Sequence, residues 1–149
     1  MPDARRLVPG TWFTTVRRRG AKQVTHTIIT FTSDGGMVER AEPRVEASIG
    51  VWEPGDKEDE FRTMRYRFLE DLKISETAEE KPGQNEEVEA VTESFAAIQR
   101  VRTTFRLTND DHFEGTVTSD FLDAAEVPLP VPASRADSKG ERLTLVREA

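Results

Sequence analysis

The sequence predicts an all-β fold, an eight-stranded antiparallel up-and-down β-barrel. Apolar and polar residues alternate with a period of two along most of the chain, and these stretches are rich in β-branched and aromatic residues. Turn residues separate the stretches, and no window keeps the helical period of 3.6 residues for long. Because 149 residues are enough for one domain with a real core, we expect a single domain over residues 1–149.

The predicted strands follow one another along the chain, and polar turns separate most of them. Gly20 ends the first strand, the sequence SDGG ends the second, and Pro43 ends the third. Consecutive hairpins make a meander, and eight such strands can close into a barrel without a free edge. The strands are expected at residues 11–18, 22–32, 37–41, 45–52, 60–69, 92–107, 112–122 and 141–147.

Two connections are predicted to be long. Residues 71–91 are rich in glutamate and poor in large apolar residues, which indicates a solvated acidic loop, with a mobile lid as the alternative. Residues 127–139 contain three prolines in alternate positions, which favour an extended, semi-rigid backbone. Because these loops follow strands five and seven, both leave the barrel at the same end. We expect that end to be the mouth.

Composition and charge limit the classes of partner that this chain is expected to bind. The formal net charge of -7 disfavours a nucleic-acid partner and an anionic membrane surface. The chain has no cysteine, so it has no disulfide and no cysteine-ligated metal site. No apolar run approaches the roughly 20 residues that span a bilayer, and residues 1–9 lack the apolar core of a signal peptide. We expect a cytoplasmic protein without nucleic-acid or membrane partners, and its oligomeric state stays open.

The beginning of the first strand carries a family resemblance. Gly10, Thr11 and Trp12 resemble the Gly-x-Trp signature of lipocalins and related calycin barrels. In that family a late arginine packs over the tryptophan and closes the narrow end of the barrel. If the leucines at 143 and 145 point inward, Arg147 shares their face and Arg142 does not. We therefore expect Trp12 and Arg147 to form this plug.

The resemblance implies a bacterial, cytosolic type of lipocalin-like barrel that binds a small, largely apolar molecule inside. The related heme-binding nitrobindins carry a glycine-rich signature that extends further than Gly10-Thr11-Trp12, and neither histidine of this chain is placed as a heme ligand. The two distant histidines give no metal-ligand spacing either. We expect no metal and no cofactor.

Strand parity selects candidate ligand-binding residues. If Tyr66 in strand five points inward, Met64 on the same face also points inward. In strands six and seven, the inward positions include Gln99, Phe105 and Ser119. Strand two has apolar residues on both faces, so the orientation of His26 stays open. His26 points inward together with Val24, or it points outward while Phe31 points inward. A lone inward polar residue is more often a satisfied core hydrogen bonder than a ligand contact. The candidates are Tyr66, Gln99, Met64, Phe105, Ser119 and His26.

Two functions stay open at this point. The chain lacks a Gly-x-Ser-x-Gly elbow, a phosphate-binding glycine-rich loop, a dinucleotide fingerprint and a His-Glu-x-x-His helix. The leading hypothesis is therefore binding of a small hydrophobic molecule. The alternative is a cofactor-free cyclase or isomerase of natural-product biosynthesis, whose cavity would fold a hydrophobic substrate into a reactive conformer. No residue is assigned a catalytic role, and enzymatic activity is left undecided.

Overall fold

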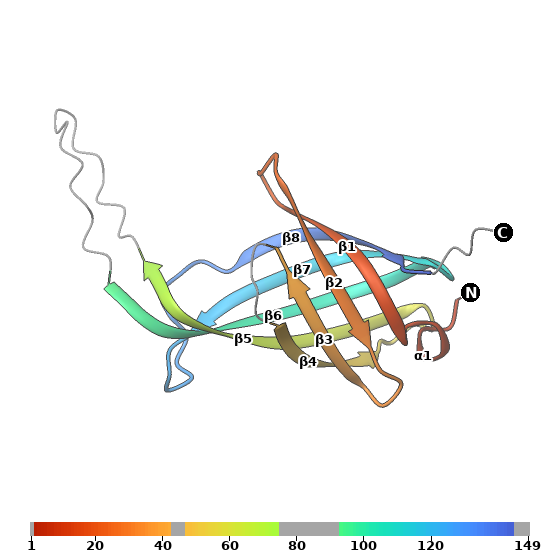
Figure 1. Cartoon of the computed structure of the whole chain (residues 1–149), viewed down its shortest axis with the longest axis horizontal. Helices are drawn as coiled ribbons and strands as arrows, with labels where there is room; N and C mark the ends of the chain where they lie inside the picture. Colours follow the sequence, from red (N-terminus) through yellow and green to blue (C-terminus); the bar gives the residue numbers. More distant parts are fainter. Residues whose placement is uncertain (1, 43–46, 75–92, 145–149) are drawn as a thin grey trace.

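The structure, a computed structural model, describes residues 2–42, 47–74 and 93–144. Within these ranges eight antiparallel strands form a closed barrel in which each strand pairs with its neighbours in the chain and the last strand closes on the first (Figure 1). The predicted fold class is confirmed. The elements are α1 Ala4–Leu7, β1 Gly10–Arg18, β2 Val24–Phe31, β3 Gly36–Ala41, β4 Ala47–Pro54, β5 Glu60–Ile74, β6 Glu93–Asn109, β7 His112–Leu122 and β8 Ser134–Arg142.

The predicted position of the last strand is wrong. We expected it at 141–147, but β8 is Ser134–Arg142 and takes up part of the segment assigned to the loop 127–139. Its register on β1 runs from Trp12 opposite Arg142 to Arg18 opposite Ala136. The period-two signal was hidden because the inward residues of β8 are small or polar, and hydropathy does not mark them as core.

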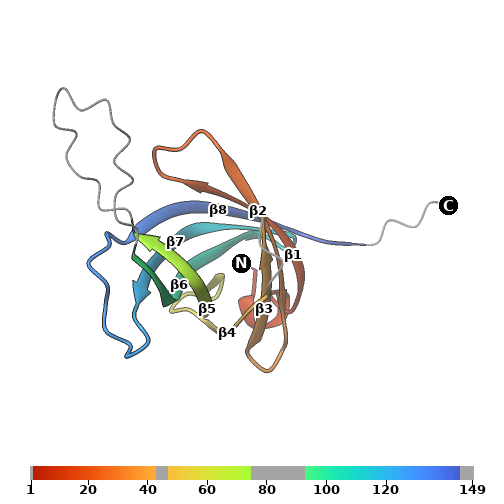
Figure 2. The same cartoon turned by 60° about the vertical axis from the view of Figure 1, so that its left-hand side comes forward.

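The acidic connection also begins later than predicted. β5 continues to Ile74, so residues 71–74 belong to a strand, and the rest of the predicted loop 71–91 lies outside the described residues. Figure 2 shows that the ends of β5 and β7 lie at the same side of the barrel, next to the start of β6. The described part of the molecule contains no helix that is long and apolar enough to cross a membrane.

Aromatic side chains fill the half of the barrel where β1 begins. The Phe113 ring centroid lies 4.9 Å from that of Trp12, 4.5 Å from that of Phe105 and 5.4 Å from that of Phe61. Gly140 makes room for this packing, because a Cβ there would lie 2.2 Å from the Phe113 ring. Phe105 therefore belongs to the packed core.

The closed end of the barrel is built on a tryptophan and an arginine, but the arginine is Arg142. Its guanidinium carbon lies 4.4 Å from the centroid of the fully buried Trp12 ring. Trp12 Nε1 donates to the Val8 carbonyl at 2.9 Å. Arg142 donates to the carbonyls of Leu7, Pro9 and Asp110. These bonds tie β8 to the chain before β1 and to the β6–β7 turn.

The preference for Arg147 over Arg142 is thus corrected by the structure, and Arg147 itself lies outside the described residues. The parity argument failed because it assumed inward leucines, whereas Leu143 is 50% exposed. Gly10 has a φ of 135°, and a Cβ there would lie 2.9 Å from Arg142 Nη1. The glycine of the Gly-x-Trp pattern therefore makes room for the arginine.

Replacing the two plug residues singly and together should show that their contributions to stability are coupled. Trp12→Ala should cost about 3–5 kcal/mol because it removes a large buried ring. Arg142→Ala should cost less, and the double mutant should lose about 1 kcal/mol less than the sum, the value of a partly desolvated cation–π contact. Urea unfolding of all variants measures this. Arg147→Ala is the control, and coupling of Trp12 to Arg147 instead of Arg142 would contradict the assignment.

Candidate functional site

The other half of the barrel contains a partly open cavity of about 170 Å³. Val16 and Arg18 near the end of β1 line it, so it lies at the end opposite Trp12, where β5 and β7 also finish. This position agrees with the predicted mouth. Valine and alanine side chains supply the apolar wall, and the polar wall consists mainly of Arg65, Arg67, Gln99, Ser119 and Ser134.

The strand β5 presents the opposite face from the predicted one. Phe61, Thr63 and Arg65 are buried, whereas Tyr66 is 40% exposed and Phe68 is 75% exposed on the outside of the barrel. Met64 shares the outer face with Tyr66, so neither residue lines the cavity. The parity assignment failed because it followed hydrophobicity. Here two arginines point inward, since a carboxylate on another strand compensates their charge.

That carboxylate belongs to Glu39 on β3, which is 1% exposed. Arg65 Nε donates to Glu39 Oε1 at 2.8 Å, and Arg65 Nη2 lies 2.6 Å from Oε2. Arg67 Nη2 also donates to Oε1, while Arg67 Nε donates to Ser48 Oγ at 2.7 Å. Two guanidinium groups thus share one carboxylate, which leaves one positive charge in excess within this cluster of three residues.

Burial and the charge of Glu39 shift the pKa of the Arg65 guanidinium in opposite directions. Burial of this 4%-exposed residue lowers the pKa of its guanidinium, Glu39 opposes that effect, and the neighbouring Arg67 adds to it. Among the described residues, Arg65 Nη1 has no hydrogen-bond partner, and neither does the buried Gln99 Oε1. Buried polar groups are rarely left unpaired, because each lost hydrogen bond costs about 1–3 kcal/mol. Unpaired donor and acceptor groups therefore belong to two residues of the cavity wall.

Two predicted site residues do line the cavity. Gln99 on β6 stands opposite Arg67 in the sheet, which places both side chains on the inner face. Ser119 on β7 is buried, and its Oγ lies 2.7 Å from Ser134 Oγ on β8. Inward parity is confirmed for both residues. The structure brings them together with the arginines, and it leaves Tyr66, Met64 and Phe105 elsewhere.

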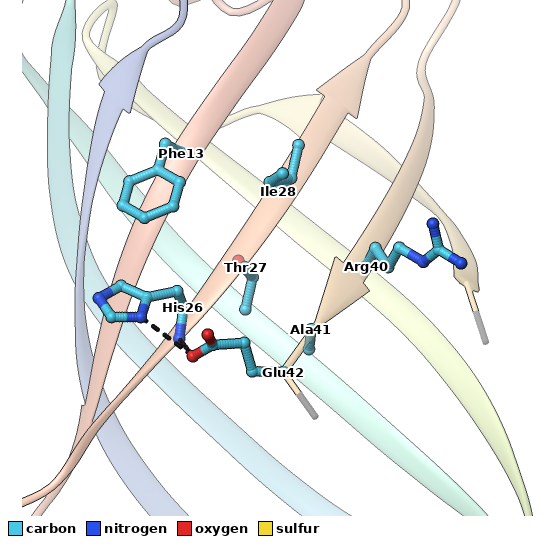
Figure 3. A pocket seen from close by; sticks show the side chains of 7 residues that line it. All are labelled: Phe13, His26, Thr27, Ile28, Arg40, Ala41 and Glu42. Carbon is cyan, nitrogen blue, oxygen red and sulfur yellow. Dashed lines mark hydrogen bonds and ion pairs between the residues drawn. The ribbon is translucent and has the colours of Figure 1, made fainter. Parts of the chain in front are cut away.

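His26 lies on the outer face of β2, the second of the two alternatives, with Ile29 and Phe31 inside. It lies beside Phe13 and Glu42 (Figure 3). The three residues line a surface groove of about 340 Å³. The His26 ring stacks on Phe13 at 5.2 Å between centroids, and its Nδ1 lies 3.0 Å from Glu42 Oε2. The hydrogen bond with His26 lowers the pKa of the Glu42 carboxyl. His26 is therefore a surface residue and does not line the interior cavity.

Sequence reasoning missed Glu39, Arg65 and Arg67. One signal was available: Glu39 alternates in phase with Met37 and Ala41, and Arg65 alternates in phase with Phe61. Charged residues in phase with large apolar ones, on two strands and with opposite signs, indicate a buried ion pair. Among the described residues, no group of three His, Asp or Glu side chains is placed to hold a metal ion.

Glu39→Gln should destabilise the fold strongly, because it leaves Arg65 and Arg67 buried without a counter-charge. Removing one partner of a buried ion pair typically costs about 3–5 kcal/mol. The control is Asp120→Asn, which breaks the more exposed pair with Arg100 and should cost about 0–1 kcal/mol. Urea unfolding at neutral pH compares the two. Equal losses would show that the Glu39 cluster is well solvated.

Comparison with known proteins does not place this chain in a family. No protein-family model matches the sequence, and no curated protein matches it. The closed antiparallel barrel is consistent with a calycin-like fold. A barrel of this kind is compatible with ligand binding but does not specify a ligand, so function has to be argued from the cavity.

Proposed function

We propose that the chain binds a small, largely apolar molecule inside the mouth half of the barrel. The observation that carries the proposal is the cavity of about 170 Å³ between the Glu39–Arg65–Arg67 cluster and the barrel end where β5 and β7 finish. Part of its wall consists of Val16, Val101, Val117 and Ala136, which suit an apolar ligand. Eight-stranded barrels have interiors wide enough for one small ligand where side chains do not fill them.

The two halves of the interior differ because their side chains differ in size. Phenylalanine and tryptophan rings pack the half near Trp12. In the mouth half, inward positions of β7 and β8 are occupied by Ser119, Ser134 and Ala136. These side chains are too small to meet across the barrel. The composition of these strands therefore supports a binding space at this end.

The size of the cavity limits the ligand. Pockets for drug-sized molecules usually measure about 300–1,000 Å³. The cavity of about 170 Å³ is smaller than this range. The ligand is accordingly a compact molecule, or the enclosed end of a longer one that leaves through the mouth.

Filling the cavity should abolish binding. Ala136→Phe places a ring in the interior, whereas Arg135→Phe places the same ring on the exposed outer face of β8. In native mass spectrometry of the freshly purified chain, we expect a bound compound with the wild type and with Arg135→Phe. Ala136→Phe should reduce its occupancy at least about tenfold, equivalent to about 1.4 kcal/mol. Unchanged occupancy in Ala136→Phe would contradict an interior site.

The same compound separates a carrier from an enzyme. Recovery of the compound unchanged after incubation with fresh protein supports the binding function. Its conversion to a product, with loss of conversion in Ala136→Phe, would instead favour the cyclase or isomerase. Mass spectrometry and chromatography of the released compound provide this measurement.

A further inference from the structure

We infer that the ligand of this cavity is a small carboxylic acid in its anionic form, recognised by Arg65 and Arg67. This inference rests on the proposed function and adds the chemical class of the ligand. Three features of the cavity support it: an excess of positive charge, a guanidinium donor without a partner, and apolar side chains in the rest of the wall.

The cavity is cationic although the chain is acidic. Arg65 and Arg67 share the single carboxylate of Glu39, and the other charged residues of the wall, Arg18 and Glu42, have opposite signs. Among the described residues of the wall, one positive charge therefore remains in excess, in a chain with a formal net charge of -7. The excess is local, and a single negative charge on the ligand would neutralise it. A doubly charged phosphate would overcompensate it.

The excess charge is held at a fixed place in the barrel. Glu39 fixes Arg65 through Nε and Nη2, and Glu39 and Ser48 fix Arg67 through Nη2 and Nε. Guanidinium groups ordered in this way lose little further freedom when they bind a carboxylate, and their planar forks match its two oxygens. The geometry is thus prepared for a planar anion before the ligand arrives.

The donors of the cluster are not all used. Within the described residues, Arg65 Nη1 has no hydrogen-bond acceptor, although the side chain is 5% exposed, and Glu39 Oε2 accepts no hydrogen bond although it forms an ion pair with Arg65 Nη2. A buried cationic donor without a partner is costly, and a carboxylate oxygen is the acceptor that satisfies it best. Gln99 stands opposite Arg67 on the inner face, and its Nε2 amide can donate to a carboxylate oxygen, whereas its unpaired Oε1 is an acceptor that a carboxylate does not satisfy.

The remaining wall selects against a purely polar anion. Val101, Val117 and Ala136 face the same space as the arginines. A ligand that pairs its carboxylate with the guanidinium groups has to place its remaining atoms against these methyl groups. A short aliphatic or aromatic carboxylate satisfies both parts of the wall, whereas inorganic phosphate leaves the apolar surface uncovered.

Neutral counterparts of two acids test the ligand class directly. Butyrate and benzoate are compared with butyramide and benzamide in NMR titrations of the ¹⁵N-labelled full chain, with inorganic phosphate as a further probe. We expect each acid to shift amide resonances of β5 and β6 near Arg67 and Gln99, with an affinity at least about tenfold above that of its amide. Phosphate should not produce these shifts.

Arg67→Gln is the decisive variant, because it removes the excess charge and leaves the Glu39–Arg65 pair intact. It should weaken binding of the acids at least about tenfold and leave the amides unchanged. Arg102→Met, on the exposed outer face of β6, is the matched control and should change neither. Circular dichroism confirms that both variants fold.

The outcomes distinguish this inference from the proposed function. If acids and amides bind equally, or if Arg67→Gln weakens neither, the ligand class is wrong while interior binding stands. If neither acid produces shifts near Gln99, the carboxylate assignment is overturned. Native mass spectrometry of the wild type and of Ala136→Phe then decides separately whether the cavity binds another compound. Shifts with phosphate that match those of the acids would also overturn the assignment.

Discussion

The closure of β8 against β1 is the constraint on which the rest of this barrel depends. Without that pairing both strands would be edges, and the interior would open along its length. Trp12 and Arg142 hold the pairing at one end, because the guanidinium lies on the ring and bonds to carbonyls before β1 and in the β6–β7 turn. Small inward residues of β8, Ser138 and Gly140, let the strand approach the packed rings.

Closure also divides the interior into layers of different chemistry. Next to the plug, aromatic rings pack edge to face and exclude space. Two buried hydroxyl pairs follow across neighbouring strands, Thr14 with Thr27 and Thr63 with Thr103. Thr27 of the first pair also lines the cavity, together with Arg65 and Arg67. The aromatic packing at the plug and the cavity therefore lie at opposite ends of the barrel, so changes at the mouth need not disturb the plug.

In the proposed function, the buried ion cluster would give the cavity its preference for an anionic ligand. A lone buried arginine would be unfavourable, and the nearby carboxylate makes two of them tolerable. Because the compensation is incomplete, the cluster keeps an attraction for an anion. The apolar surface of Val101 and Val117 stands beside it. A cavity with one charged and one apolar side favours amphiphilic molecules, and it fits a carrier as well as an enzyme that orients its substrate.

The sequence by itself determined the local features of this protein. Its alternation and turn residues predicted the strand class, most strand positions and the inward faces of Gln99 and Ser119, because these depend on neighbours within a few residues. Tertiary structure decided the position of β8, the choice of Arg142 and the inward arginines of β5. The reason is physical: alternation tells which residues of a strand share a face, but partners on other strands decide which face turns inward. Glu39 is such a partner for Arg65, and it lies 26 residues away in the chain.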